Sequence, residues 1–367
     1  MLRVSFNFLG ILGVFAASCT GPEVDEPKAQ LPENLMVEIT LSSNVRGKVD
    51  VKATAQKVNY YSVLFGSSAT GVSIETTTGN ASYTFDKPGT YPIRVRAHTT
   101  KTAFIEEVDS VVIDEAGLQD GYNTPSSYSG YNLVWADEFN GSDLDLNNWS
   151  FNIGRGNGGW GNNESQYYTD GANNLMVKDG RLVITAKKES IGDAEYSSAR
   201  IVTQGKKEFQ FGRIDIRAKL PKGQGIWPAL WMLGSNITSV GWPACGEIDI
   251  MELIGHIPNT VYGTAHWGSS FPSTYKTGQI SLPAGEFDDQ YHVFTIIWEQ
   301  NQIKWYMDDK AFHTITPSNT GSIYPFNNKF FFIFNVAVGG NWPGYPDGTT
   351  VFPQTMEVDF IRVFQKN

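Results

Sequence analysis

Cysteine is nearly absent from this chain of 367 residues, which has only Cys19 and Cys245. Two cysteines exclude a disulfide-rich scaffold and a cysteine-rich zinc site. Basic residues are also scarce: 28 Lys and Arg stand against 38 Asp and Glu, for a net charge of −10. Nucleic acid is therefore not expected as a partner, because its phosphates need a basic surface. Four of the five histidines show no metal-ligand spacing, so no catalytic metal or other cofactor is expected.

The apolar run at the start of the chain is too short to cross a membrane. It extends from about Phe6 to Ala17, after Arg3, whereas a spanning helix needs about 20 residues. This pattern is typical of a secretory signal over residues 1–18. Its end, Ala16-Ala17-Ser18-Cys19, resembles a bacterial lipoprotein box and implies lipidation of Cys19. The alternative is an ordinary cleaved signal with an incidental cysteine.

Residues 19–35 are rich in proline and acidic residues and are predicted to form a tether. Similar tethers follow the lipidated cysteine of some surface-exposed lipoproteins. We therefore expect an exported protein, anchored by lipid at the bacterial cell envelope, in the outer membrane and at the cell surface. With Cys19 lipidated, Cys245 has no partner for an intrachain disulfide.

Tryptophan is missing from the first 134 residues, and all ten lie at or after Trp135. This step in composition predicts a domain boundary. The first module, residues 36–118, has short alternating strand patterns that are typical of a small β-sandwich. Residues 83–91, YTFDKPGTY, resemble PKD-like modules of the immunoglobulin type. The module shows no catalytic cluster, so it is either a spacer or a glycan-binding module, and residues 119–130 are the predicted linker.

The second domain, residues 131–367, alternates strand patterns with loops rich in Gly, Asn and Pro and has no clear helical period. This pattern predicts one large all-β sandwich or jelly roll. Aromatic residues reach 13% of the chain. Aromatic faces are what sugar-binding clefts use, so this content is a first indication of a carbohydrate ligand.

Three acidic residues, Glu247, Asp249 and Glu252, lie within the apolar segment GEIDIMELIGH. Side chains alternate between the two faces of a strand, so Glu247 and Asp249 share a face and Glu252 has the wrong parity. A β-bulge near Ile250 or Met251 would return Glu252 to the acidic face. The three carboxylates would then line one cleft.

Such a set of carboxylates suits glycoside hydrolysis with retention of configuration. That chemistry needs a nucleophilic carboxylate and a carboxylic acid about 5–5.5 Å apart. Close carboxylates repel each other, so one keeps a proton and serves as the acid. The alternative interpretation is an edge strand with solvated acidic residues.

The segment GEIDIMELIGH resembles the active-site strand of glycoside hydrolase family 16 in its bulged E-x-D-x-x-E form. The resemblance covers residues 131–367 and includes GGWGNNESQYYT at 158–169, FGRIDIRAKLPKGQGIWPALWMLG at 211–234 and FNVAVGGNWPG at 334–344. It implies a jelly roll with an open concave cleft. Glu247 is then the nucleophile, Glu252 the acid/base and Asp249 the group that assists the nucleophile. The loops resemble those of laminarinase-like endo-β-1,3-glucanases.

The resemblance also implies a set of sugar-binding residues. Trp227 and Trp231 share one face of a strand, which is the cleft face by resemblance and would otherwise be core. Arg200 is expected to bind sugar at the cleavage site, with a surface ion pair as the alternative. A purely structural role is the alternative for His266. The predicted substrate-binding residues are Asn163, Arg200, Trp227, Trp231, Trp242 and His266.

In relatives a structural calcium lies on the convex side, far from the chemistry. The matching positions are Glu138, the carbonyl of Gly180 and Asp359, and calcium prefers such oxygen ligands. The predicted function is an endo-acting, retaining β-1,3-glucanase that works as a monomer. The alternatives are a non-catalytic glucan-binding protein on the same fold, or the same chemistry on mixed-linkage β-glucan or a marine galactan.

Overall fold

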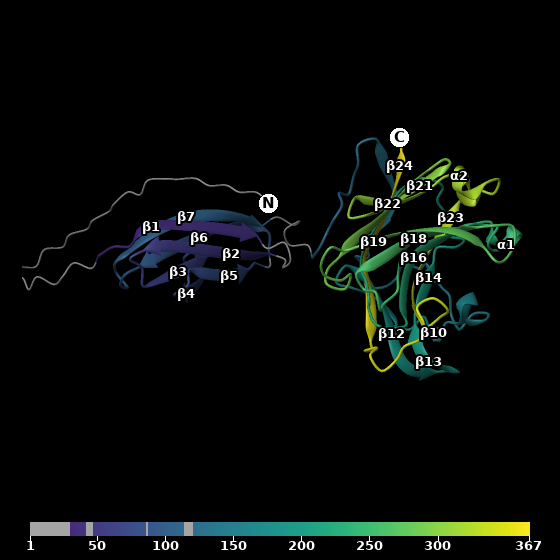
Figure 1. Cartoon of the computed structure of the whole chain (residues 1–367), viewed down its shortest axis with the longest axis horizontal. Coiled ribbons are helices and arrows are strands. Elements are labelled where there is room, and N and C mark those ends of the chain that lie inside the picture. The colour runs from purple at the N-terminus through teal and green to yellow at the C-terminus, as the bar shows by residue number, and fades with distance from the viewer. Residues whose placement is uncertain (1–29, 42–46, 86, 114–119) are drawn as a thin grey trace, which may run out of the picture. The chain divides into compact units, whose positions relative to one another are not determined.

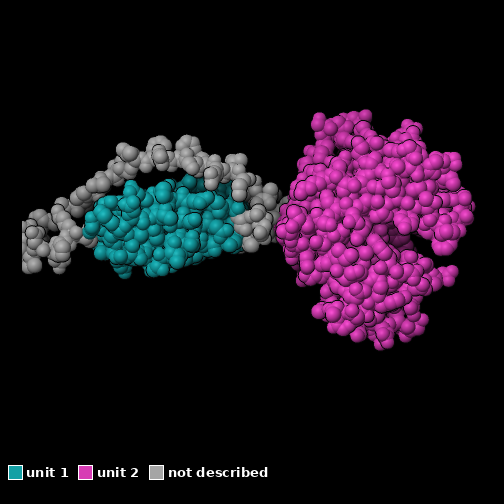
Figure 2. All heavy atoms as spheres, in the orientation of Figure 1, with its two compact units in different colours: residues 1–42, 47–114 teal, residues 43–46, 115–367 magenta. Residues whose placement is uncertain are grey.

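The computed structural model describes residues 30–41, 47–85, 87–113 and 120–367. The predicted signal peptide, Cys19 and the tether as far as residue 29 lie outside these residues. The chain divides into two compact units, residues 1–42 with 47–114, and residues 43–46 with 115–367 (Figures 1 and 2). Within the described ranges, no helix has the length and apolarity that a membrane span requires.

The first unit is a small β-sandwich, as predicted. One sheet has the order β1-β2-β5 and the other β4-β3-β6-β7. Alternate residues of β2 and β6, such as Val49, Val51, Ile93 and Val95, are fully buried between the sheets. The strands are β1 (Glu33–Leu41), β2 (Lys48–Gln56), β3 (Tyr60–Phe65), β4 (Val72–Thr76), β5 (Asn80–Thr84), β6 (Gly89–His98) and β7 (Phe104–Ile113).

The second unit is the larger all-β sandwich that the sequence predicts. A seven-stranded sheet has the order β19-β18-β17-β16-β23-β14-β9. A ten-stranded sheet has the order β10-β13-β12-β24-β15-β20-β21-β22, with β11 beside β12 and β8 beside β24. Its strands are β8 (Tyr131–Asp137), β9 (Ser150–Phe151), β10 (Gln166–Tyr168), β11 (Leu175–Lys178), β12 (Arg181–Ile191), β13 (Ala194–Ser198), β14 (Arg200–Val202), β15 (Gly212–Lys219), β16 (Ile226–Gly234), β17 (Glu247–Leu253), β18 (Thr260–Trp267), β19 (Thr274–Ser281), β20 (His292–Glu299), β21 (Gln302–Met307), β22 (Lys310–Ile315), β23 (Phe330–Val338) and β24 (Gln354–Lys366).

Among the residues that the structure describes, helices occur only as single turns in the loops of this unit. They are η2 (Gly159–Asn163), α1 (Ile237–Val240), α2 (Pro317–Thr320) and η3 (Pro325–Asn327).

The core of the second unit lies between its two sheets. On β16, Leu230 and Met232 are fully buried in this core. On β23, Phe332, Phe334 and Val336 are buried in the same core. The residues that alternate with them point to the outer face of the seven-stranded sheet, so the period of two predicted for these strands sets which side chains are free to line a cleft.

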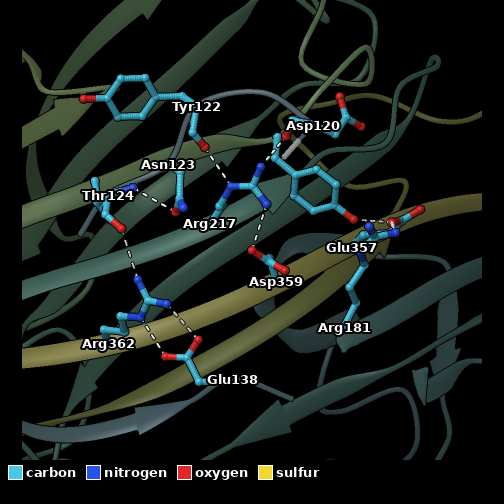
Figure 3. Close-up of polar contacts among 11 residues, drawn as sticks. Asp120, Tyr122, Asn123, Thr124, Glu138, Arg181, Arg217, Glu357, Asp359 and Arg362 are labelled. Atoms are coloured by element: carbon cyan, nitrogen blue, oxygen red, sulfur yellow. Dashed lines mark hydrogen bonds and ion pairs between the residues drawn. The ribbon is translucent and has the colours of Figure 1, made fainter. Parts of the chain in front are cut away.

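Residues 120–130, which we call the N-terminal strap, pack on the second unit although they were predicted to be part of a linker. The amide of Tyr122 donates a hydrogen bond to the carbonyl of Tyr291 at 2.9 Å. Arg217 Nε donates to the carbonyl of Tyr122 at 2.7 Å, and Arg362 Nη1 donates to the carbonyl of Thr124 at 3.2 Å (Figure 3). The arginines thus bind backbone carbonyls that a free linker would expose to water, which explains why this segment belongs to the second unit.

Candidate active site

The three carboxylates lie on β17, and a bulge sets their direction. Along β16, Trp231 is opposite Asp249 and Leu230 is opposite Met251, so Ile250 has no partner there. Ile250 and Met251 are consecutive residues, yet both are buried in the core. The extra residue returns Glu252 to the face of Glu247 and Asp249. The bulge predicted from the spacing of the acidic residues is therefore confirmed.

A tryptophan from the opposite sheet supports the bulge. The indole of Trp305 on β21 donates a hydrogen bond to the carbonyl of Asp249 at 2.8 Å. Gly263 on β18 makes room for that ring, since a Cβ there would lie 2.5 Å from the ring of Trp305. The backbone polar group that the bulge frees thus has a partner inside the core, where leaving it unpaired would cost free energy.

A pocket of about 790 Å³ lies on the outer face of the seven-stranded sheet and contains all three carboxylates. The space-filling view shows the surface of this unit hollowed (Figure 2). Of the six predicted substrate-binding residues, five line this pocket: Arg200, Trp227, Trp231, Trp242 and His266.

Glu247 has partners at both carboxylate oxygens. The indole of Trp242 donates a hydrogen bond to Oε2 at 2.8 Å. His266 Nε2 lies 3.7 Å from Oε1 and 3.4 Å from Oδ2 of Asp249. The register explains this, because Glu247 and His266 are directly opposite each other on β17 and β18. The nucleophile predicted from the sequence is therefore held at one end of the row of carboxylates.

Glu252 lies at the other end of the row in a different electrostatic setting. Burial and the charge of Glu247 raise the pKa of Glu252 to about 8, although the indole of Trp227 donates a hydrogen bond to its Oε1 at 3.0 Å and opposes that shift. Burial, and then Glu247, also raise the pKa of Asp249. Glu252 therefore keeps its proton near neutral pH, which is what a general acid requires.

Arg200 packs between two indoles. Its guanidinium carbon lies 4.4 Å from the ring centre of Trp160 and 4.9 Å from that of Trp231, and its Nε donates to Oδ1 of Asn152 at 3.1 Å. Burial lowers the pKa of Arg200, while neighbouring Tyr168, Glu164 and Glu247 raise it. Arg200 thus lies in the pocket, with its guanidinium between two aromatic faces.

A buried polar network at the floor of the pocket contains residues, Glu164 and Asn335 among them, that were not predicted from the sequence. Glu164 Oε2 accepts hydrogen bonds from Gln166 Nε2 at 2.7 Å and from the Tyr168 hydroxyl at 3.2 Å. Asn335 donates to that hydroxyl at 3.1 Å and accepts from the indole of Trp231 at 2.7 Å. The network connects a buried fourth carboxylate to a cleft tryptophan. Two sequence features could have predicted it: the polar residues of the NNESQYY motif, and Asn335 as the single polar residue in the apolar strand β23.

Asn163 does not line the pocket, although it was predicted to bind sugar hydroxyls. Its side-chain amide donates to Oδ1 of Asn341 at 2.9 Å, and its carbonyl accepts from the hydroxyl of Tyr345 at 3.3 Å. Its φ angle of 57° turns the backbone so that its neighbour Asn162 lines the pocket instead. Asn163 therefore connects two loops at the pocket rim.

Two groups of aromatic rings flank the row of carboxylates. At the Glu247 end, the first aromatic group packs around Trp242 and His266, and at the Glu252 end the second packs around Trp227. Phe271 and Trp342 are 79% and 41% exposed, as expected for rings that meet a ligand. The first aromatic group is Trp242, His266, Phe271 and Tyr275, and the second is Trp227, Tyr262 and Trp342.

Two of the three predicted calcium ligands, Glu138 and Asp359, each bind an arginine side chain (Figure 3). Arg362 Nε and Nη2 donate to the two carboxylate oxygens of Glu138 at 2.6 and 2.8 Å. Asp359 Oδ2 accepts from Arg217 Nη1 at 2.8 Å. The Glu138 carboxylate therefore does not fit a calcium ligand, because a guanidinium occupies both of its oxygens. Oδ1 of Asp359 and backbone carbonyls, such as that of Gly180, do fit.

Comparison with known families agrees with this geometry. The model described as Glycosyl hydrolases family 16 matches residues 162–362. A second model, described as Beta-glucan synthesis-associated protein SKN1/KRE6/Sbg1, matches residues 65–248 and so crosses the boundary between the two units.

Individual proteins also resemble this chain. It is 40% identical over 281 residues to glucan endo-1,3-beta-glucosidase A1 of Niallia circulans. The matched region covers 70% of this chain and 41% of that protein. It is 40% identical over 248 residues to the beta-glucanase of Rhodothermus marinus. The matched region covers 64% of this chain and 85% of that protein. The solved structure of the laminarinase catalytic domain of Thermotoga maritima MSB8 is 48% identical to this chain, with a TM-score of 0.61. The match covers 65% of this chain and 100% of the solved chain.

The family 16 match extends over more than half of the chain and includes all three carboxylates of β17. Enzymes of this family need no cofactor for catalysis. The chain belongs to glycosyl hydrolase family 16.

Proposed function

We propose that this protein is an endo-acting, retaining glycoside hydrolase that cleaves β-1,3-glucan of the laminarin type. The observation that carries this proposal is the pair of glutamates at the two ends of the row on β17. Glu247 accepts a hydrogen bond from Trp242, whereas burial raises the pKa of Glu252 to about 8. Two carboxyl groups on one face, one of which keeps its proton near neutral pH, are what a retaining mechanism requires.

The two glutamates divide the reaction into two displacements. In the first, Glu252 gives its proton to the glycosidic oxygen, and a carboxylate oxygen of Glu247 attacks the anomeric carbon while the bond to the leaving sugar breaks. In the second, Glu252 takes a proton from water, which attacks the same carbon and releases Glu247. Asp249 lies beside Glu247, and its proton stabilises the negative charge of the nucleophile before the first displacement and again as that charge returns in the second.

The substrate and the endo mode follow from the pocket and the relatives. The first and second aromatic groups lie at opposite ends of the carboxylate row, so sugar units on both sides of the cleaved bond have an aromatic surface to stack on. Binding on both sides suits cleavage within a chain. The relatives named above support β-1,3-glucan as the substrate.

Release of reducing ends from laminarin tests the proposal. We expect the wild type to release a range of oligosaccharides, with the β-anomer formed first in proton NMR spectra. Glu247→Gln should lose several orders of magnitude in turnover, since an amide is a poor nucleophile. Glu195→Gln, an exposed change on β13, is the matched control. If no product forms in buffers from acidic to mildly alkaline pH, the protein is instead a non-catalytic glucan-binding protein. If product forms only from mixed-linkage glucan or a galactan, the assigned substrate is wrong.

The N-terminal region is proposed to place the enzyme at the cell surface. A lipid on Cys19 would anchor the chain in the outer membrane, and the first unit would act as a spacer or as a glycan-binding module. Metabolic labelling with a fatty acid analogue should mark the wild type and not Cys19→Ala. Binding of insoluble glucan by the isolated first unit would favour the glycan-binding role. Size-exclusion chromatography with light scattering checks the proposed monomer.

A structural calcium is proposed on the convex side, with Oδ1 of Asp359 and the carbonyl of Gly180 as ligands. The support is chemical: a carboxylate oxygen and a carbonyl are ligands that calcium prefers. Removal of calcium with EGTA should lower the melting temperature of the wild type and leave Asp359→Asn unaffected. An equal melting temperature with and without EGTA in the wild type would contradict the site.

A further inference from the structure

Glu247, Asp249 and His266 form a ready set of ligands for a metal ion. One ligand atom from each lies within 4.8 Å of the other two. The imidazole Nε2 is 3.4 Å from Asp249 Oδ2 and 3.7 Å from Glu247 Oε1. A tetrahedral ion with bonds of about 2.0–2.2 Å holds its ligands about 3.3–3.6 Å apart. The two distances from the imidazole are therefore already close to the separation that such an ion requires.

Neighbouring groups fix the direction of these ligands. His266 Nδ1 lies 3.3 Å from the hydroxyl of Ser273, which orients the ring with Nε2 toward the carboxylates. The indole of Trp242 binds Oε2 of Glu247 and leaves Oε1 on the side of His266. Hydrogen bonds of this kind, made by the atoms that do not bind the metal, accompany most metal-binding histidines and carboxylates.

Asp249 supplies an independent indication. Its side chain is buried, with the residue only 3% exposed, and among the described residues no hydrogen bond reaches Oδ2. The His266 imidazole Nε2 lies 3.4 Å from this oxygen. A buried carboxylate oxygen without a close donor is costly, and a cation at this position would remove that cost.

We propose that a divalent transition-metal ion of the zinc class binds to Glu247, Asp249 and His266 and reversibly inhibits the enzyme. Two oxygens and one imidazole nitrogen suit Zn²⁺, Co²⁺ or Ni²⁺, whereas Ca²⁺ and Mg²⁺ prefer six or more oxygens. Two carboxylates balance the charge of the ion, and the open pocket leaves its fourth position for water. The ion occupies Oε1 of Glu247, so that oxygen no longer reacts with sugar. The inhibition rests on the proposed function, but the binding does not.

Calorimetric titration of the full chain with zinc chloride tests the binding. We expect one ion per chain, and a dissociation constant raised at least about tenfold in His266→Gln and in Asp249→Asn. His256→Gln, an exposed change in the loop after β17, and Cys245→Ser, which removes the buried thiol, should keep the wild-type constant. Cobalt should give the intense visible spectrum of a tetrahedral site in the wild type. Circular dichroism checks that each variant folds.

Hydrolysis measurements test the inhibition separately. Zinc should inhibit laminarin hydrolysis competitively, and EDTA should restore the rate. Wild-type zinc affinity in both folded ligand variants would overturn the site. Tight binding with an unchanged hydrolysis rate would overturn the inhibition. If the protein cleaves no glucan, the proposed function fails, while the calorimetric comparison still decides whether the site exists.

Discussion

The indole nitrogen of Trp227 lies 3.0 Å from Oε1 of Glu252 and donates a hydrogen bond to it. Trp227 was predicted as a sugar platform, yet this bond also makes it a regulator of the acid. A donor to a carboxylate favours the ionised form and lowers its pKa. Here it opposes burial and the charge of Glu247, which together raise the pKa of Glu252 to about 8.

Trp227→Phe should therefore move the alkaline limb of kcat/KM to higher pH. The acid must be protonated to act, so activity is lost as pH rises through the pKa of Glu252. Removal of the indole donor raises that pKa further, and the loss then occurs at higher pH. Trp231→Phe is the matched control, because its indole binds Asn335 instead. An alkaline limb at the same pH in Trp227→Phe and the wild type would refute the assignment.

Glu252→Gln should stabilise the fold while it abolishes hydrolysis of laminarin. The pKa of Glu252 rises from 4.5 to about 8 on folding, so the folded state holds a proton that the unfolded state has lost. The wild type thus loses stability as pH rises between these two values, by up to about 5 kcal/mol. The amide has no charge to desolvate. Its stabilising effect should be near zero at pH 4.5, grow toward pH 8 and be absent in Glu195→Gln, as read from thermal unfolding.

Glu164→Gln should weaken substrate binding from beneath the pocket. Burial raises the pKa of Glu164, and its charge in turn supports the buried guanidinium of Arg200. Without that charge Arg200 is less well compensated, which we expect to cost on the order of 1–3 kcal/mol of stability and to raise KM more than it lowers kcat. Steady-state kinetics and thermal unfolding check this, with Glu195→Gln as control. A changed melting temperature with wild-type KM would mean a structural role alone.

Gly121→Ala should detach part of the N-terminal strap. Gly121 has a φ of +83°, and a Cβ there would lie 2.0 Å from the carbonyl oxygen of Tyr291. Gly130→Ala is the matched control, since Gly130 has a similar φ of +79° and no atom within 4 Å of the added carbon. The clash should cost about 1–3 kcal/mol beyond the strain that both variants share. Equal melting temperatures of the two variants would show that the strap adds nothing to stability.

The carboxylate row could be predicted from sequence because it depends on one strand. The period of two and the odd spacing of Glu252 were sufficient to predict a bulge near Ile250 or Met251, and the structure places it at Ile250. The pairing of Trp227 and Trp231 on one face follows from the same rule. Residues that reach the pocket from loops, such as Phe271 and Trp342, could not be placed, because no local period fixes the path of a loop.

The buried network and the convex face depended on partners far away in the sequence. Glu164 and Asn335 are connected by hydrogen bonds through Tyr168. No spacing of residues in the sequence predicts such a contact. Glu138 matched a calcium ligand by residue type, but its neutralisation by Arg362, 224 positions later, is visible only in the folded chain. Asn163 was predicted to lie in the pocket, but the preceding residue, Asn162, lines it instead. The left-handed backbone of Asn163, which causes this, could not be predicted from the residue type.

The strap has a consequence for how a polymer reaches the enzyme. Arg217 and Arg362 project from the outer face of the ten-stranded sheet, whereas the pocket opens on the outer face of the seven-stranded sheet. The chain therefore joins the catalytic unit at its back. A glucan strand bound along the carboxylate row therefore lies on the face away from the attachment point, which suits action on the middle of a polysaccharide.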